Sequence, residues 1–213
     1  MRTDDLVTML ASGAGAVRPH QALRRHLAAL AWASLGAALL MAGLLGPRHD
    51  LAQALLLPMF WVKVAFAACL VAGSMVAALR LSRPGLRLTW VPGALGAPVL
   101  ALWLLAALVL ARADPTQRAI LFFGDTWDVC PFLIALLSVP GFIASMWAMK
   151  GLAPTRLRLA GAAAGLFAGA VATLVYCLHC PEMAAPFIAF WYVLGMLIPT
   201  AVGALLGPRL LRW

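Results

Sequence analysis

Two short polar stretches, residues 124–130 and 177–182, carry most of the side chains in this chain that could do chemistry. Each stretch lies between two long apolar runs. Together they supply three thiols, an imidazole, three carboxylates and an indole: Cys130, Cys177, Cys180, His179, Asp125, Asp128, Glu182 and Trp127. If both stretches lie on the same side of a membrane, these side chains can meet.

Thiol chemistry is the first possibility. Cys130 begins one apolar run and Cys180 ends the turn between two others, so we expect the two thiols at nearly the same membrane depth. Two thiols in an oxidising compartment can form a disulfide once their Cα atoms come within about 7 Å. A permanent structural disulfide, a reversible redox or metal switch, and free cysteines all remain open at this point.

Metal binding is the second possibility, because thiolates and imidazole are ligands that Cu(I) and Zn(II) prefer. The local donors would be Cys177, His179, Cys180 and Met183, with Cys130 from the other stretch. Their spacing is not that of a zinc finger. We therefore expect no certain cofactor, with a copper or zinc ion as a candidate signal.

The composition of the chain indicates which kind of structure positions these residues. Hydrophobic residues make up 64% of the chain and charged residues 11%, with a mean hydropathy of +0.97. A soluble domain carries roughly 25% charged residues, so the chain is predicted to be an integral membrane protein. The net charge of +9 is explained by basic residues beside apolar spans rather than by nucleic-acid binding. We therefore expect the protein to contact membrane lipid and not to bind DNA or RNA directly.

An apolar stretch of about 20 residues crosses a bilayer as a helix, because only a helix satisfies its backbone amides there. The fold class is therefore all-α, a bundle of six transmembrane helices. The predicted spans are residues 27–45, 56–79, 89–111, 130–149, 157–178 and 186–207. They form one domain, 27–213, behind a soluble segment, 1–26.

Two sequence features predict details of the bundle. Kinks are expected at Pro92 and Pro98 in the third span and at Pro199 in the sixth. Glycines recur every four residues in the fifth span, at 161, 165 and 169. Because small residues let two helix backbones approach closely, we interpret this stripe as a packing face.

Basic residues predict the orientation. Twelve of the sixteen Lys and Arg residues fall in the two terminal segments and the second and fourth loops: Arg2, Arg18, Arg24, Arg25, Arg80, Arg83, Arg87, Lys150, Arg156, Arg158, Arg209 and Arg212. Only Arg48, Arg112 and Arg118 fall in the other loops. By the positive-inside rule both termini are predicted to be cytoplasmic and both polar stretches to face the opposite side. That side is oxidising if the membrane is a bacterial inner membrane.

Two further residues lie inside the second span. An ammonium within a span is costly and needs a partner or a route to the interface, so Lys63 should extend towards Asp125, Asp128 or Glu182. A lysine near a thiol also lowers the pKa of that thiol, which would give Lys63 a tuning role together with Trp127. Cys69 is expected to be an inert core residue.

The N-terminal segment is predicted to contain a short helix. Thr3 can cap it, Asp4 and Asp5 lie in its first turn, and Leu6, Met9 and Leu10 fall on one face. Adsorption to the membrane surface is one interpretation of this amphipathic helix. The two carboxylates oppose binding to an anionic leaflet, so docking on a protein partner is favoured.

Five motifs then suggest a family. In chain order they read MRTDDL at 1–6, PMFWVK at 58–63, TWDVC at 126–130, LHCPE at 178–182 and LLRW at 210–213. This set resembles the NrsF family of multi-pass bacterial inner-membrane proteins, negative regulators of an extracytoplasmic-function (ECF) sigma factor.

The resemblance implies a regulator and not an enzyme. A six-helix anti-sigma factor would hold an ECF sigma factor through its cytoplasmic N-terminus, with Asp4, Asp5, Leu6, Met9 and Leu10 as contacts. The family's two functional cysteines map onto Cys130 and Cys180, with metal or oxidative stress as the class of signal, and Cys177 is an additional thiol.

Two other classes of function stay open. A small-solute transporter would line its path with intramembrane polar groups, of which Lys63 is the one charged candidate. A membrane thiol oxidoreductase would use the Cys-X-X-Cys spacing of Cys177 and Cys180. Flux that depends on Lys63, or turnover of a dithiol substrate, would distinguish these classes from a sensor.

Overall fold

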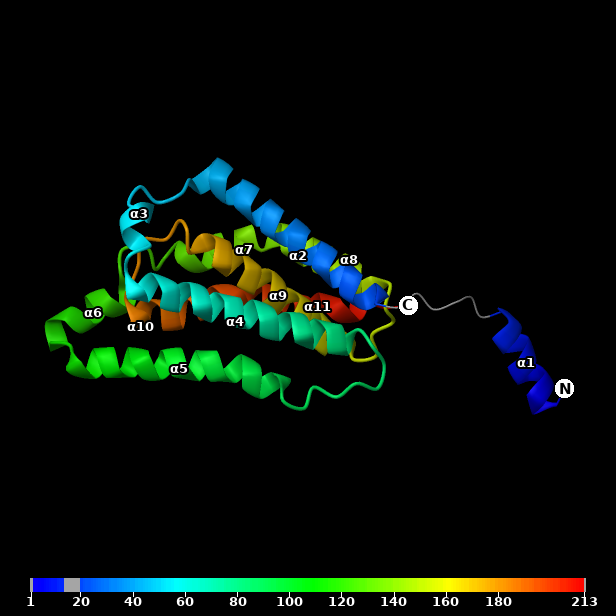
Figure 1. Cartoon of the computed structure of the whole chain (residues 1–213). Helices are drawn as coiled ribbons and strands as arrows, with labels where there is room; N and C mark the ends of the chain where they lie inside the picture. Colours follow the sequence, from blue (N-terminus) through cyan, green and yellow to red (C-terminus); the bar gives the residue numbers. More distant parts are fainter. Residues whose placement is uncertain (1, 14–19, 213) are drawn as a thin grey trace.

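The computed structural model of the chain describes residues 2–13 and 20–212. Arg18, which contributed to the predicted orientation, and the motif ends Met1 and Trp213 lie outside the described residues. Within these ranges every regular element is a helix and no strand is found, which confirms the predicted all-α class. Figure 1 shows long helices running side by side, with α1 (Thr3–Gly13) apart from them.

The remaining elements follow in chain order. The first half contains α2 (Gln21–Leu40) with a π-helical turn η1 (Met41–Leu45), the short α3 (Leu51–Ala54), α4 (Pro58–Leu81), α5 (Val91–Arg112) and α6 (Pro115–Phe123). The second half contains α7 (Cys130–Leu137), α8 (Val139–Lys150), α9 (Leu157–Tyr176), α10 (Ala185–Phe187), a second π-helical turn η2 (Ile188–Tyr192) and α11 (Val193–Leu210).

Five of these helical segments are long and apolar enough to cross a membrane, and α7 with α8 makes a sixth if the bent pair is one span. The segments overlap all six predicted spans. The helices continue through Pro98 and Pro199, and the kinks expected at these prolines and at Pro92 stay predictions. A bend of 43° falls between α7 and α8. Pro140 in the first turn of α8 explains this position, because proline lacks an amide hydrogen and its ring crowds the preceding turn.

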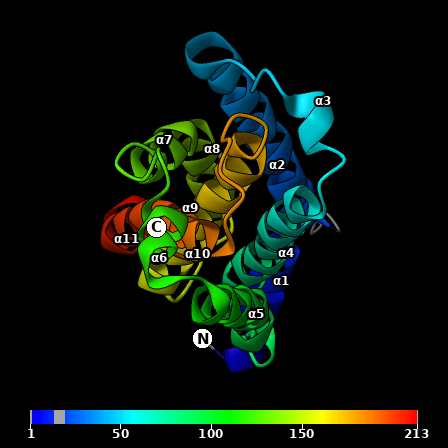
Figure 2. The same cartoon turned by 90° about the vertical axis from the view of Figure 1, so that its left-hand side faces the viewer.

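Helix α9 forms the centre of the bundle. It packs most extensively against α11, then against α4 and α8, and also contacts α2 and α7. Figure 2, which looks along the bundle, shows α9 surrounded by these neighbours. Half of its residues are alanine or glycine, so neighbouring backbones can approach closely on several sides at once.

The glycine stripe of α9 confirms the predicted packing face. A Cβ at Gly161 would overlap the carbonyl oxygen of Gly203, and a Cβ at Gly165 would overlap that of Pro199. At Gly169 it would lie 3.1 Å from the Cα of Met196. The two backbones of α9 and α11 are therefore in direct contact along this stripe.

The bundle has two chemically different ends (Figure 1). One end, here called the thiol end, carries α3, α6, α10 and the 177–184 loop. The other, here called the basic end, carries the α4–α5 and α8–α9 connections, the C-terminus and, beyond it, α1. The thiol loops and the N-terminal helix thus lie at opposite ends of the molecule. Which side of a membrane each end faces stays a prediction from charge.

Candidate functional site

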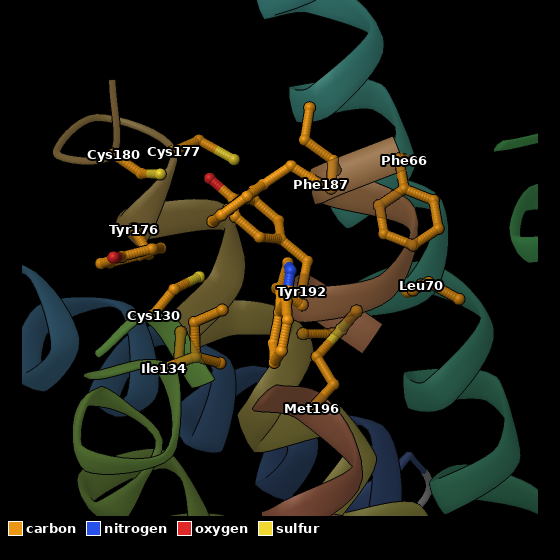
Figure 3. Close-up of a cluster of buried hydrophobic side chains, with 14 of the residues drawn as sticks. Phe66, Leu70, Cys130, Ile134, Tyr176, Cys177, Cys180, Phe187, Tyr192 and Met196 are labelled. Carbon is orange, nitrogen blue, oxygen red and sulfur yellow. The ribbon is translucent and has the colours of Figure 1, made fainter. Parts of the chain in front are cut away.

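Three of the four cysteines gather at the thiol end. Cys130 is the first residue of α7, Cys177 directly follows α9, and Cys180 lies three residues further in the loop to α10. All three are free thiols and fully buried. Figure 3 shows their sulfur atoms within one cluster of buried side chains that also contains Tyr176 and Tyr192. The predicted meeting of the two polar stretches therefore occurs at these thiols.

Cys130 and Cys180 are direct neighbours. Their side chains lie close enough to interact, and the hydroxyl of Tyr176 lies near both sulfurs. The hydroxyl of Tyr192 also approaches Cys180. It is the one buried side-chain polar atom in the described ranges that lacks a hydrogen bond of normal geometry, so it is available as a donor if negative charge develops on Cys180.

The two loop thiols differ in acidity. The hydrogen bond from Cys130 lowers the pKa of Cys180 below its ordinary value, and the Tyr192 hydroxyl and the Lys63 ammonium act in the same direction against the effect of burial. Burial raises the pKa of the Cys177 thiol to about 12. Because the thiolate is the nucleophile, this order of pKa values favours Cys180 over Cys177 as the attacking thiol.

Lys63 organises the loop that carries Cys180. Its side chain is fully buried, and its Nζ donates hydrogen bonds to the carbonyl oxygens of Cys180 at 3.0 Å and Glu182 at 3.2 Å. The side chain extends towards the thiol end, as predicted. It reaches Glu182, one of the three residues predicted, through the main-chain carbonyl and not through the carboxylate.

A second cation, Arg48, binds the same turn. Its backbone amide donates to the carbonyl of Leu178 at 3.1 Å, and its guanidinium donates to the carbonyl of Cys180 at 3.3 Å. The same guanidinium forms an ion pair with Asp50 at 2.6 Å. The sequence analysis counted Arg48 only as a loop cation and did not predict that it binds this turn. Two cationic donors thus fix the carbonyl of Cys180.

Glu182 joins the two polar stretches. Its Oε1 accepts hydrogen bonds from the amide of Asp125 at 2.8 Å and from Thr126 Oγ1 at 3.5 Å. The carboxylate lies against Gly124, whose φ of +56° and lack of a Cβ permit the approach. The loop that precedes Cys130 is therefore held on the loop that follows Cys180.

Replacing Glu182 by alanine is expected to release the 124–129 loop and destabilise the protein by about 1.5–3 kcal/mol, since hydrogen bonds to a charged group are lost. Thermal unfolding of the purified protein and the rate of proteolysis in this loop measure the effect. Asp128→Ala is the matched control, because Asp128 is exposed in the same loop and makes no hydrogen bond or ion pair within the described ranges. Equal effects of both variants would contradict this role of Glu182.

The other predicted tuning residues lie further from the thiols. Trp127 is exposed and packs against Phe123 at 5.4 Å and Trp191 at 5.3 Å between ring centroids. The Trp191 indole in turn donates to the carbonyl of Phe122 at 2.9 Å. Asp125 is exposed and acts through its backbone amide. These contacts attach α6 to η2 at the rim of the thiol cluster.

The metal-ligand set predicted from sequence is only partly assembled. His179 bonds through Nδ1 to the carbonyl of Gly46 at 2.8 Å, and Met183 is half-buried in the same loop. Across the described part of the chain, no group of three or more His, Cys, Asp or Glu side chains is arranged to hold a metal ion. The two adjacent thiols are the donors that the geometry offers.

Two expectations concern residues outside this cluster. In α1, Leu6, Met9 and Leu10 are exposed, and Asp4 and Asp5 lie in the first turn as predicted. Cys69 was expected in the core, and this was wrong, because it lies on an exposed face of α4. An apolar thiol on a lipid-facing surface is chemically consistent with its position in an apolar span.

The fold and the site define a class: an all-helical protein with the composition of a membrane protein, whose buried thiol pair lies at the end opposite an exposed amphipathic helix. Residues 10–213 match the family model described as "NrsF: Negative regulator of sigma F". The chain belongs to this family, whose relatives are regulators and not enzymes.

Two relatives match over the full length of both chains. The "Probable anti-sigma-F factor NrsF" of Azospira oryzae is 64% identical over 213 residues. The "Anti-sigma-F factor NrsF" of Caulobacter vibrioides is 41% identical over 217 residues. No solved structure matches the chain.

Proposed function

We propose that this protein is an inner-membrane anti-sigma factor that binds an ECF-type sigma factor through α1 and releases it when the Cys130–Cys180 pair reacts. The observation that carries the proposal is the adjacency of these two thiols, one of them with a lowered pKa, at the end of the bundle opposite α1. The names of the two relatives support the regulatory class.

The sigma-binding surface is the apolar face of α1. Leu6 is 38% exposed, Met9 58% and Leu10 64%, which leaves an apolar stripe without a partner in the described structure. A sigma-factor groove can bury this stripe, as in other helix-in-groove complexes. Asp4 and Asp5 can then face basic residues of the sigma factor, and such complementary charges increase specificity and the association rate.

Docking through α1 predicts a strong effect of two substitutions. In the full-length protein, Leu6→Ala with Leu10→Ala should reduce co-purification of the sigma factor at least tenfold. Burial of each leucine side chain in the complex is expected to contribute about 1.5–3 kcal/mol of binding free energy. Thr8→Ala is the matched control, since Thr8 lies on the polar side of α1. Unchanged capture by the double variant, or an equal loss with Thr8→Ala, would rule out this surface.

The sensing step we propose uses a peroxide as the oxidant. The Cys180 thiolate attacks the O–O bond and forms a sulfenic acid, with loss of water after one proton is taken up. The Cys130 thiol then attacks the sulfenic sulfur, the S–S bond forms and a second water leaves. Overall the two thiols lose two electrons and two protons, and the peroxide is reduced to two waters. The alternative signal is a thiophilic copper or zinc ion held by the two sulfurs.

The change can reach α1 through α7 and α8. Cys130 begins α7, which meets α8 at the 43° bend, and α8 packs along α2. The closest contact is between Gly36 and Pro140, where a Cβ on Gly36 would lie 2.5 Å from the Cβ of Pro140. A shift of α7 towards the 177–184 loop would move the bend and thereby α2, which leads to α1. This bend is the two-state element of the proposal.

The two rival functions have less support. A dithiol enzyme built on Cys177 and Cys180 needs a reactive Cys177, and the pKa of that thiol is raised. A transporter that depends on Lys63 needs this ammonium to face a solute path, and it is buried on the carbonyls of residues 180 and 182.

A further inference from the structure

A small polar cavity of about 220 Å³ opens at the basic end of the bundle, between the α4–α5 connection and the start of α9. Three arginines line it, Arg83, Arg87 and Arg156, together with Thr155. Leu81 and Leu86 form its apolar edge. The cavity is distant from the thiol cluster and plays no part in the proposed sensing step.

The three arginines have no acidic partner in the described structure. The one ion pair found within residues 2–13 and 20–212 is Arg48 with Asp50, at the thiol end. Five of the seven acidic residues belong to that end, namely Asp50, Asp114, Asp125, Asp128 and Glu182, and the other two are Asp4 and Asp5 of α1. Positive charge in the cavity is therefore uncompensated, which favours an anionic ligand.

The loop that carries two of these arginines has a defined shape. Arg80 donates through Nη1 to the carbonyl of Arg87 at 3.0 Å and to Thr89 Oγ1 at 3.2 Å, and its guanidinium lies 5.1 Å from the ring centroid of Trp90. Gly85, with a φ of +81°, makes the turn. Arg80 thus holds the backbone in place and leaves the side chains of Arg83 and Arg87 free for a ligand.

The position of the cavity identifies the ligand class. Leu81 ends one apolar span and Leu157 begins another, so the cavity lies at the level where phospholipid headgroups meet a bilayer. Trp90 is 54% exposed and Leu86 45% exposed beside it, and exposed tryptophan is typical of that interface. Planar guanidinium groups bind phosphate oxygens with paired hydrogen bonds.

We propose that this cavity binds the phosphate group of an anionic phospholipid, with Arg83, Arg87 and Arg156 on the phosphate oxygens and Leu86 beside the first part of an acyl chain. Free phosphate offers the same anionic oxygens without the chain. Within this protein, the acidic side chains that do not belong to the thiol end are Asp4 and Asp5 of α1, and α1 lies apart from the bundle (Figure 1). Basic pockets between membrane helices are known sites for anionic headgroups.

Native mass spectrometry of the full-length protein, released from bilayer nanodiscs, tests this site. Phosphatidylglycerol should bind at least tenfold more tightly than phosphatidylcholine, and Arg83→Gln with Arg87→Gln and Arg156→Gln should remove that preference. The matched control is Arg24→Gln with Arg158→Gln and Arg209→Gln, which removes the same charge outside the cavity and should change the affinity less than threefold. If the triple variant is not folded, the single variant Arg156→Gln should lower the affinity at least threefold.

Three outcomes would overturn the proposal. An equal loss in both triple variants would show general attraction to the basic end. Equal competition by inorganic phosphate would show a site for free phosphate and not for lipid. Tighter lipid binding after Asp4→Asn with Asp5→Asn would show that α1 occupies the cavity.

Discussion

Gly165→Ala is expected to lower the stability of the protein by about 3 kcal/mol, near the upper end of the usual cost of overpacking. The added methyl group would overlap the carbonyl oxygen of Pro199, which is backbone and cannot turn aside as a flexible side chain can. Helices α9 and α11 would have to separate along the whole stripe. For a chain of this length, the midpoint of thermal unfolding should fall by about 6–12 °C.

Gly93→Ala is the control for this prediction. Gly93 also lies in a helix that is long and apolar enough to cross a membrane, α5, but a Cβ there meets no atom within 4 Å. The substitution should leave stability unchanged or raise it by up to about 1 kcal/mol through helix propensity. An equal fall in the unfolding midpoint for both variants would contradict the direct backbone contact between α9 and α11.

The sequence located the long apolar helices, because hydropathy reports directly on the cost of placing a side chain in lipid; five of them, or six with the bent pair, could cross a membrane. It also identified the glycine stripe, since Gly161, Gly165 and Gly169 repeat at a spacing that keeps them on one helix face. The bend between α7 and α8 was missed. The sequence pattern did not single out Pro140, which packs against Gly36 of α2 in the structure.

The thiol site was predicted in part. Cys130 and Cys180 were expected to meet, because each lies at the end of an apolar run and both runs end on the same predicted side of the membrane. The acceptors of Lys63 and the role of Arg48 depend on the path of the 178–182 backbone. Every residue has the same main-chain carbonyl group, so the sequence does not show which carbonyl a buried cation will bind.

The largest effect on function is expected from the thiol pair itself. In cells that report sigma-factor activity, Cys180→Ser and Cys130→Ser should each reduce the response to hydrogen peroxide at least tenfold, because either change removes one atom of the disulfide. Cys177→Ser should retain the response. It is the matched control, since Cys177 is also buried at this end but its thiol has a raised pKa.

Peptide mass spectrometry after brief peroxide treatment should find a disulfide between Cys130 and Cys180. The reduced protein should show no such disulfide and should not release the sigma factor. A Cys177–Cys180 link, or full response in the Cys130→Ser variant, would contradict the proposed pair. If copper or zinc is the signal, the same two variants should lose the response to that ion while peroxide leaves the wild-type thiols free.

The pH dependence of the reaction gives an independent reading of the same site. The hydrogen bond from Cys130 lowers the pKa of Cys180, so the thiolate persists at pH values where an ordinary cysteine is already protonated. The rate of the purified protein with peroxide should therefore fall only at a pH below that at which a cysteine peptide loses its rate. In Cys130→Ser the hydroxyl is a different donor, so the midpoint of this fall should shift. A midpoint equal to that of the free peptide in the wild-type protein would mean that Cys180 is not activated by its neighbours.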